Sequence, residues 1–175
     1  HLSESKRILL LSGPNAGGKT VLLKSVGLAA HMARCGLLIC ADEGSTLPFL
    51  TSIHSAIGDA QNVDHHLSTF AAHLQRLNEM AQLEGFNHLL LIDEICGSTD
   101  PEEGSALARS FIETFASHHL FAVITSHLGP LKLGWQDSPV INGSLAYDSE
   151  KGLPTYQFVM GVAGQSLALQ TAQRV

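Results

Sequence analysis

Residues 13–20 of the chain read GPNAGGKT, which matches GxxxxGK[ST], the pattern of a phosphate-binding loop. The stretch comes directly after an apolar run at residues 8–11 and directly before a helical pattern, which is the context that the motif requires. Its glycines let the backbone wrap closely around phosphate oxygens, so that N–H groups and the positive end of the helix face one anion. The alternative interpretation is a glycine-rich turn with an incidental lysine.

If the stretch is a phosphate loop, its lysine and threonine have defined tasks. Lys19 would neutralise the β- and γ-phosphates of ATP, and Thr20 would give its hydroxyl to Mg²⁺. We therefore expect ATP and Mg²⁺ as the bound species. The nucleotide would be held by Gly13, Pro14, Asn15, Ala16, Gly17, Gly18, Lys19 and Thr20.

Short apolar runs of strand length recur along the chain and alternate with helical patterns. The runs lie at residues 8–11, 37–41, 89–93 and 122–125, and the helical patterns lie at residues 20–35, 68–83 and 103–115. Asp100 could cap the last helix, with Pro101 in its first turn. The alternation predicts a three-layer α/β fold of the P-loop type, with a mostly parallel sheet and helices on both faces.

The tail has a different pattern. Residues 140–148 and 155–160 flank a turn-like tetrapeptide at 149–152, which predicts an antiparallel hairpin at the end of the sheet. A final helix is expected to start near Gln165 or Ser166. No internal repeat or linker divides the chain, so we interpret residues 1–175 as one domain.

Composition limits the kind of protein and its partners. With 45% apolar and 15% charged residues and no apolar run near the roughly 20 residues needed to span a bilayer, no membrane contact is indicated. The net charge of −6 has the wrong sign for gripping a duplex through its phosphates, so DNA contacts should lie outside this chain. The chain starts directly before a strand pattern and stops inside a helical one, which suggests a fragment of a longer protein.

Cysteines and histidines give no metal-site spacing. Cys35, Cys40 and Cys96 form no CxxC pair, which suggests reduced thiols in the cytoplasm. The ten histidines include two adjacent pairs, whose side chains diverge on a helix or strand. A zinc site is therefore not expected.

Two carboxylates follow the buried run at residues 89–92. In the sequence LLLIDE, a buried strand would deliver Asp93 and Glu94 to its carboxyl end, where ligands bind in open α/β sheets. Asp93 would hold Mg²⁺ through water, and Glu94 would polarise the water that attacks ATP. The alternative is that the two residues merely start a loop.

A histidine follows the next buried run. We expect the strand at residues 122–125 to lie beside the one that carries Asp93, so that His127 reaches the same edge of the sheet. There it could contact the γ-phosphate or orient the water. On residue type alone, His127 would be an ordinary surface histidine.

Taken together, the motifs resemble those of the ATPase domain of MutS proteins. The resemblance rests on GPNAGGKT, LSTF at residues 67–70, LLLIDE, TDPEEG at 99–104, TSH at 125–127 and VINGS at 140–144, in consistent order over nearly the whole chain. DPEEG, VINGS and PTYQF are most similar to the second type of MutS. That branch usually carries a C-terminal Smr nuclease domain and is linked to suppression of recombination and to stalled or collided ribosomes, rather than to mismatch repair.

The resemblance implies a homodimer formed through the ATPase face, with DNA, or a ribosome and its RNA, engaged by domains outside this chain. It also implies that Ser68, at a helix start, acts in trans on the partner's γ-phosphate, whereas without the family Ser68 is only a helix cap. The loop at residues 96–99 would cross between the two sites. Here Cys96 and Ser98 stand where the family usually has glycines, which puts the conformation of this loop in question.

Three functions remain open at this point. The preferred one is a Mg²⁺-dependent ATPase, in which ATP closes a dimer and hydrolysis reopens it, with Lys19, Glu94 and His127 as catalytic residues and Thr20 and Asp93 at the metal. The second is an ATP-gated clamp that does not hydrolyse, against which the presence of both Asp93 and Glu94 argues. The third is a small-molecule kinase, which would need an acceptor pocket and a basic lid that the sequence lacks.

Overall fold

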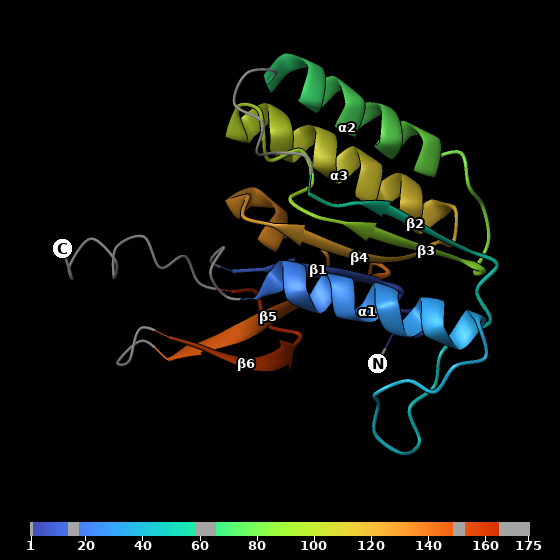
Figure 1. Ribbon diagram of the computed structural model, residues 1–175. Coiled ribbons are helices and arrows are strands. Elements are labelled where there is room, and N and C mark those ends of the chain that lie inside the picture. Colours follow the sequence, from blue (N-terminus) through green and yellow to red (C-terminus); the bar gives the residue numbers. More distant parts are fainter. Residues whose placement is uncertain (1, 14–17, 59–65, 149–152, 165–175) are drawn as a thin grey trace.

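The computed structural model describes residues 2–13, 18–58, 66–148 and 153–164 (Figure 1). In these residues, one sheet of six strands has the order β2-β3-β4-β1-β5-β6. The pairs β2–β3, β3–β4, β4–β1 and β1–β5 are parallel, and β5–β6 is antiparallel. The strands are β1 (Ile8–Ser12), β2 (Ser52–Ala56), β3 (His88–Ile92), β4 (Phe121–Ser126), β5 (Val140–Asp148) and β6 (Leu153–Met160).

Helices cover both faces of the sheet. Helix α1 (Lys19–Arg34) lies on one face, while α2 (His66–Met80) and α3 (Pro101–Ser117) lie on the other (Figure 1). A short 3-10 helix, η3 (Gly129–Lys132), follows β4. Alternate residues of the central strands point to the two faces, so the core has two parts. Leu9 packs toward α1, and its neighbour Leu10 packs toward α2 and α3.

The expected α/β fold, the three helices and the C-terminal hairpin are confirmed. Helix α3 begins as predicted, because Asp100 accepts hydrogen bonds from the N–H groups of Glu102 and Glu103 at 2.9 and 3.3 Å, with Pro101 as the first helical residue. The turn at 149–152 and the helix expected near Gln165 or Ser166 lie outside the described residues. Within the described ranges, no helix is both long and apolar enough to cross a membrane.

The strand predicted at residues 37–41 is wrong. That segment forms no strand, and Leu38 is 94% exposed. The place beside β3 is taken instead by β2, whose sequence, SIHSA, contains few large apolar residues. Because β2 is at the edge of the sheet, it needs only a few inward-facing residues such as Ile53 and Ala56, and a search for continuous apolar runs misses it.

Candidate active site

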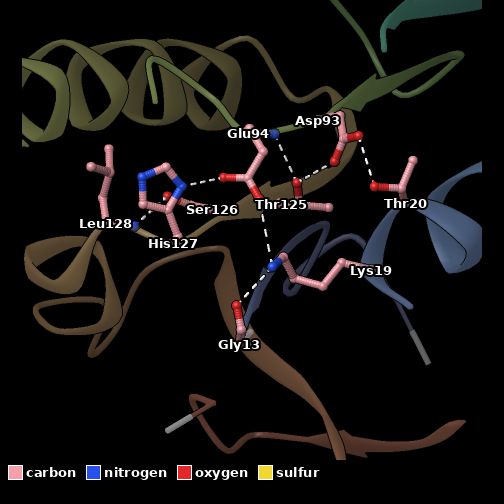
Figure 2. A network of polar contacts seen from close by, with 9 residues as sticks. All are labelled: Gly13, Lys19, Thr20, Asp93, Glu94, Thr125, Ser126, His127 and Leu128. Atoms are coloured by element: carbon pink, nitrogen blue, oxygen red, sulfur yellow. Dashed lines mark hydrogen bonds and ion pairs between the residues drawn. The ribbon is translucent and has the colours of Figure 1, made fainter. Parts of the chain in front are cut away.

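The carboxyl ends of β1, β3 and β4 meet at one edge of the sheet (Figure 2). Strand β4 lies between the other two and pairs with both in parallel. The residues that follow these strands are Gly13, Asp93 and His127, and they therefore come together although the chain separates them widely. The expectation that His127 lies at the same edge as Asp93 is confirmed.

The two described ends of the predicted phosphate loop have backbone conformations that glycine permits. Gly13 has φ of 140° and Gly18 has φ of 89°, and α1 begins directly after Gly18. Residues 14–17, and with them the predicted contacts of Pro14, Asn15, Ala16 and Gly17, lie outside the described residues.

The ammonium group of Lys19 is enclosed at the base of the site. Only 2% of this residue is exposed, and its Nζ donates to the carbonyl of Gly13 at 2.7 Å. The same atom lies 3.5 Å from Oε1 of Glu94. Burial lowers the pKa of Lys19, and the neighbouring Glu94 carboxylate opposes that change. The ammonium charge of Lys19 is thus mostly buried and faces the Glu94 carboxylate.

The side-chain oxygens of Asp93 and Thr20 lie next to each other. The Thr20 hydroxyl donates to Oδ2 of Asp93 at 2.9 Å, across the space between α1 and β3 (Figure 2). Hydroxyl and carboxylate oxygens suit Mg²⁺, which is commonly bound through one or two carboxylates together with phosphates. In the described part of the chain, no three His, Cys, Asp or Glu side chains form a metal cage, so this pair would need phosphate and water oxygens to complete the coordination.

Thr125 connects the two acidic residues. Its hydroxyl donates to Oδ1 of Asp93 at 2.6 Å and accepts the backbone N–H of Glu94 at 2.8 Å. The residue is fully buried. The sequence places Thr125 only in a strand and in the TSH segment, because nothing in a buried strand indicates which hydroxyl will face a carboxylate that follows the neighbouring strand.

Glu94 lies between two basic side chains. Its Oε1 faces Lys19, and its Oε2 contacts Nδ1 of His127 (Figure 2). Glu94 has φ of 51°, a left-handed conformation that is uncommon for a residue other than glycine. Gly97 lies against the histidine ring, since a Cβ at Gly97 would be 2.8 Å from Cε1 of His127. Two features thus accompany the Glu94–His127 contact: the left-handed backbone of Glu94 and the glycine that leaves room for the His127 ring.

The loop at residues 96–99 contains the two residues, Cys96 and Ser98, that stand where glycines were expected. Cys96 has φ of 50°, so it adopts the conformation that glycine would adopt more easily, at a cost of about 1–2 kcal/mol. Its side chain is buried in the same core cluster as Ala108 and Ile112, which offsets that cost. Burial raises the pKa of the thiol to about 11. Ser98 is exposed.

Ser68 is the third residue of α2, because the helix starts at His66 rather than at Ser68 itself. Its side chain lies outside what the structure describes. Figure 1 shows α2 starting at the same end of the molecule as α1. The action of Ser68 on a partner chain stays a prediction.

Tyr156 adjoins the phosphate loop from the hairpin, and sequence analysis did not identify it. The register of β5 and β6 shifts between Leu145 and Tyr147, where the extra residues lie in β6, and Tyr156 is within this bulge with φ of 58°. Its ring lies over the start of α1, since a Cβ at Gly18 would be 3.1 Å from two carbons of that ring. The residue is 66% exposed. A bulge of this kind re-aims a side chain, and no spacing rule locates it in advance.

Comparison with known proteins gives the same assignment as the motifs. The family model described as MutS domain V matches residues 9–175. The chain belongs to the MutS family. The protein named Endonuclease MutS2 from Thermus thermophilus is 45% identical to this MutS domain V, and the protein of the same name from Gemmatimonas aurantiaca is 42% identical. Each match covers 99% of the chain. The Streptococcus uberis protein of the same name is 38% identical over the whole chain.

This MutS domain V spans less than a quarter of the length of those relatives, with shares of 23%, 21% and 23%. The resemblance inferred from the motifs is thus confirmed at the level of the family and of its second type.

Proposed function

We propose that this MutS domain V binds ATP with Mg²⁺ and hydrolyses it to ADP and phosphate. The observation that carries the proposal is the position of the Glu94 carboxylate, held between Lys19 and His127 at the strand edge where Asp93 meets Thr20. A general base, a phosphate-binding cation and a pair of metal ligands are the parts that water attack on a γ-phosphate requires.

Binding would rearrange contacts that already exist. Lys19 would exchange part of its contact with Gly13 and Glu94 for the β- and γ-phosphates, which are stronger acceptors. Thr20 and Asp93 would hold Mg²⁺, which when bound neutralises charge on the phosphates. Tyr156 offers a flat, exposed ring beside Gly18, and we assign it to stacking on the base of the nucleotide.

Hydrolysis would depend on the geometry of Glu94. Its carboxylate would accept the proton of the attacking water, and His127, through Nδ1, would fix the direction in which that carboxylate points. The left-handed backbone at Glu94 supports this role, because strained residues are concentrated at sites where side-chain direction matters.

The wider activity follows from the relatives and belongs to the same proposal. Relatives named Endonuclease MutS2 support a DNA-directed protein, in which DNA or a ribosome would be engaged by parts outside this chain. Two copies would meet through the ATPase face, with Ser68 of each acting on the nucleotide of the other. The exposed Cys35 and Cys40 and the buried Cys96 are all free thiols, which fits a cytoplasmic protein.

Two variants test the chemistry. Glu94→Gln keeps shape and hydrogen bonding but cannot take up a proton, so steady-state hydrolysis should fall by about 10²–10⁴ while a fluorescent ATP analogue still binds. Lys19→Ala should weaken that binding while circular dichroism is unchanged. Normal binding by Lys19→Ala would refute the phosphate-loop assignment. Binding without measurable turnover in the wild type would instead favour a non-hydrolysing clamp.

The trans role of Ser68 is tested by mixing two inactive chains. Ser68→Arg leaves the phosphate loop intact but should block closure on a partner, and Lys19→Ala has an intact Ser68. In the mixed dimer one complete site is rebuilt, so activity should partly return at high protein concentration. No recovery above the sum of the two variants would count against a composite site.

A further inference from the structure

The segment at residues 161–164, which leaves β6, packs against the start of the phosphate loop. Both polar backbone atoms of Gly164 are held by side chains: its N–H donates to the Ser12 hydroxyl at 2.8 Å, and its carbonyl accepts Nζ of Lys132 at 2.7 Å. Ser12 ends β1 and Lys132 ends η3, so two separate elements hold one glycine.

Gly164 is in contact with backbone as well as side chains. A Cβ at Gly164 would overlap the carbonyl oxygen of Ser12 and would lie 2.8 Å from Cα of Gly13. These are main-chain atoms that cannot move aside as the end of a flexible side chain could. The φ of Gly164 does not lie in the left-handed region. This position therefore requires glycine for close approach and not for backbone conformation.

The contacts continue on both sides of Gly164. On one side, the Asn142 side chain donates to the carbonyl of Lys132 at 3.0 Å, and the carbonyl of Asn142 accepts the N–H of Gly161 at 2.7 Å. On the other side, the carbonyl of Gly13 accepts a hydrogen bond from the ammonium group of Lys19. A continuous set of hydrogen bonds and close contacts therefore joins the end of the hairpin to the main phosphate-binding lysine.

We propose that Gly164 is a positioning residue of the nucleotide site: held by Lys132 and Ser12, its backbone forms the wall against which Ser12 and Gly13 rest. This inference rests on the proposed function, because the wall matters for nucleotide only if the loop binds nucleotide. Without the wall, the Gly13 carbonyl and the start of the loop would lose their fixed position. A displacement of about 1 Å in such a site can lower the rate of the catalysed reaction on the order of 10²-fold.

A pair of glycine substitutions tests the wall directly. Gly164→Ala places a methyl group against the backbone of Ser12 and Gly13, whereas Gly129→Ala, the matched control, places one where no atom lies within 4 Å. Neither glycine has a left-handed φ. Gly164→Ala should bind a fluorescent ATP analogue at least roughly tenfold more weakly than Gly129→Ala, which is about the loss that one broken charge-assisted hydrogen bond to a phosphate produces. The amides of the peptide that contains Ser12 and Gly13 should also exchange hydrogen faster.

Two further variants remove the hydrogen bonds without adding volume. Ser12→Ala should weaken nucleotide binding by about three- to tenfold, which is the range for loss of one hydrogen bond. Lys132→Met should weaken it at least as much, because it also removes a positive charge that acts on Lys19, so Ser12→Ala is the variant that isolates the contact with Gly164. Lys132→Arg, which keeps a donor, should restore most of the loss. These variants decide the question if Gly164→Ala fails to fold.

The outcomes separate this inference from the proposed function. If the wild-type chain binds no nucleotide, the proposed function is wrong, and hydrogen exchange alone decides whether Gly164 supports the loop. If the wild type binds but Gly164→Ala matches Gly129→Ala within twofold in affinity and in exchange, the positioning role is wrong and the proposed function stands.

Discussion

Replacing Thr125 by valine tests whether one buried hydroxyl holds the two acidic residues in place. Valine has nearly the shape of threonine, so packing against the neighbouring strands is kept while both hydrogen bonds of the hydroxyl are lost. The loss therefore reports the hydrogen bonds and not a cavity.

The magnitude follows from the two contacts. The 2.6 Å bond to the Asp93 carboxylate is charge-assisted and is worth about 1.5–3 kcal/mol. Leaving the Glu94 N–H without a partner costs about 1–3 kcal/mol, and the lower end applies because this contact is only partly shielded. Thr125→Val should therefore lower the free energy of unfolding by about 2–4 kcal/mol.

Urea unfolding followed by circular dichroism measures the change, with Thr125→Ser as the control. Serine keeps the hydroxyl and loses one methyl group, which costs about 1 kcal/mol. The valine variant should thus unfold at clearly lower urea than the serine variant, with an unchanged slope. If Thr125→Val is as stable as Thr125→Ser or more stable, the hydroxyl does not hold Asp93 and Glu94.

Three other predictions concern titration, thiol reactivity and the base of the nucleotide. Burial, with a smaller contribution from the charge of His88, lowers the pKa of His54. As the pH falls, His54 therefore takes up a proton at higher pH in the unfolded chain than in the folded one. The contribution of neutral His54 to the free energy of unfolding should be complete above about pH 6.5 and be lost as the pH falls. The variant His54→Gln should therefore show a flatter dependence of the melting temperature on pH between about 5 and 7. Cys96, buried and with its pKa raised to about 11, should resist iodoacetamide at pH 7.5 in the folded chain while the two exposed cysteines react, as peptide mass spectrometry would show. Tyr156→Ala should weaken nucleotide binding by about 1–3 kcal/mol, measured by fluorescence titration, while Tyr156→Phe, which keeps the ring over Gly18, should bind like the wild type.

Each of these three has a result that would contradict it. A pH profile of His54→Gln parallel to that of the wild type would show that another group titrates. Labelling of Cys96 as fast as the exposed thiols would mean that its loop opens readily. Equal losses in Tyr156→Ala and Tyr156→Phe would assign the effect to the hydroxyl and not to stacking.

The parts of this protein that could be predicted are those with a local cause. The start of α1 after the glycine-rich stretch, the apolar strand before Asp93 and Glu94, and the capping of α3 by Asp100 each lie within a few consecutive residues, and each has a physical reason at that length scale. Their shared edge was also predictable, because parallel strands present their carboxyl ends together. The motifs and this rule together predicted the fold class and the position of Asp93 and Glu94 beside the predicted phosphate loop.

Other features depend on which distant residues meet, and only the tertiary structure decides that. The edge strand β2, and not the more apolar segment at 37–41, pairs with β3. Pairing there depends on how well the inward-facing residues of a strand pack, and not on the average hydropathy of the segment. Thr125 links Asp93 to Glu94 only through the pairing of β3 with β4. Such contacts leave no periodic pattern in the sequence.

The same holds for the two contacts that the C-terminal hairpin makes with the phosphate loop. The bulge and the positive φ that bring Tyr156 over Gly18 depend on how β6 registers with β5. The packing of Gly164 on Ser12 joins residues 152 positions apart. A glycine read from sequence alone could serve a turn, a flexible segment or a close approach, and only the backbone that lies against it shows which of these applies.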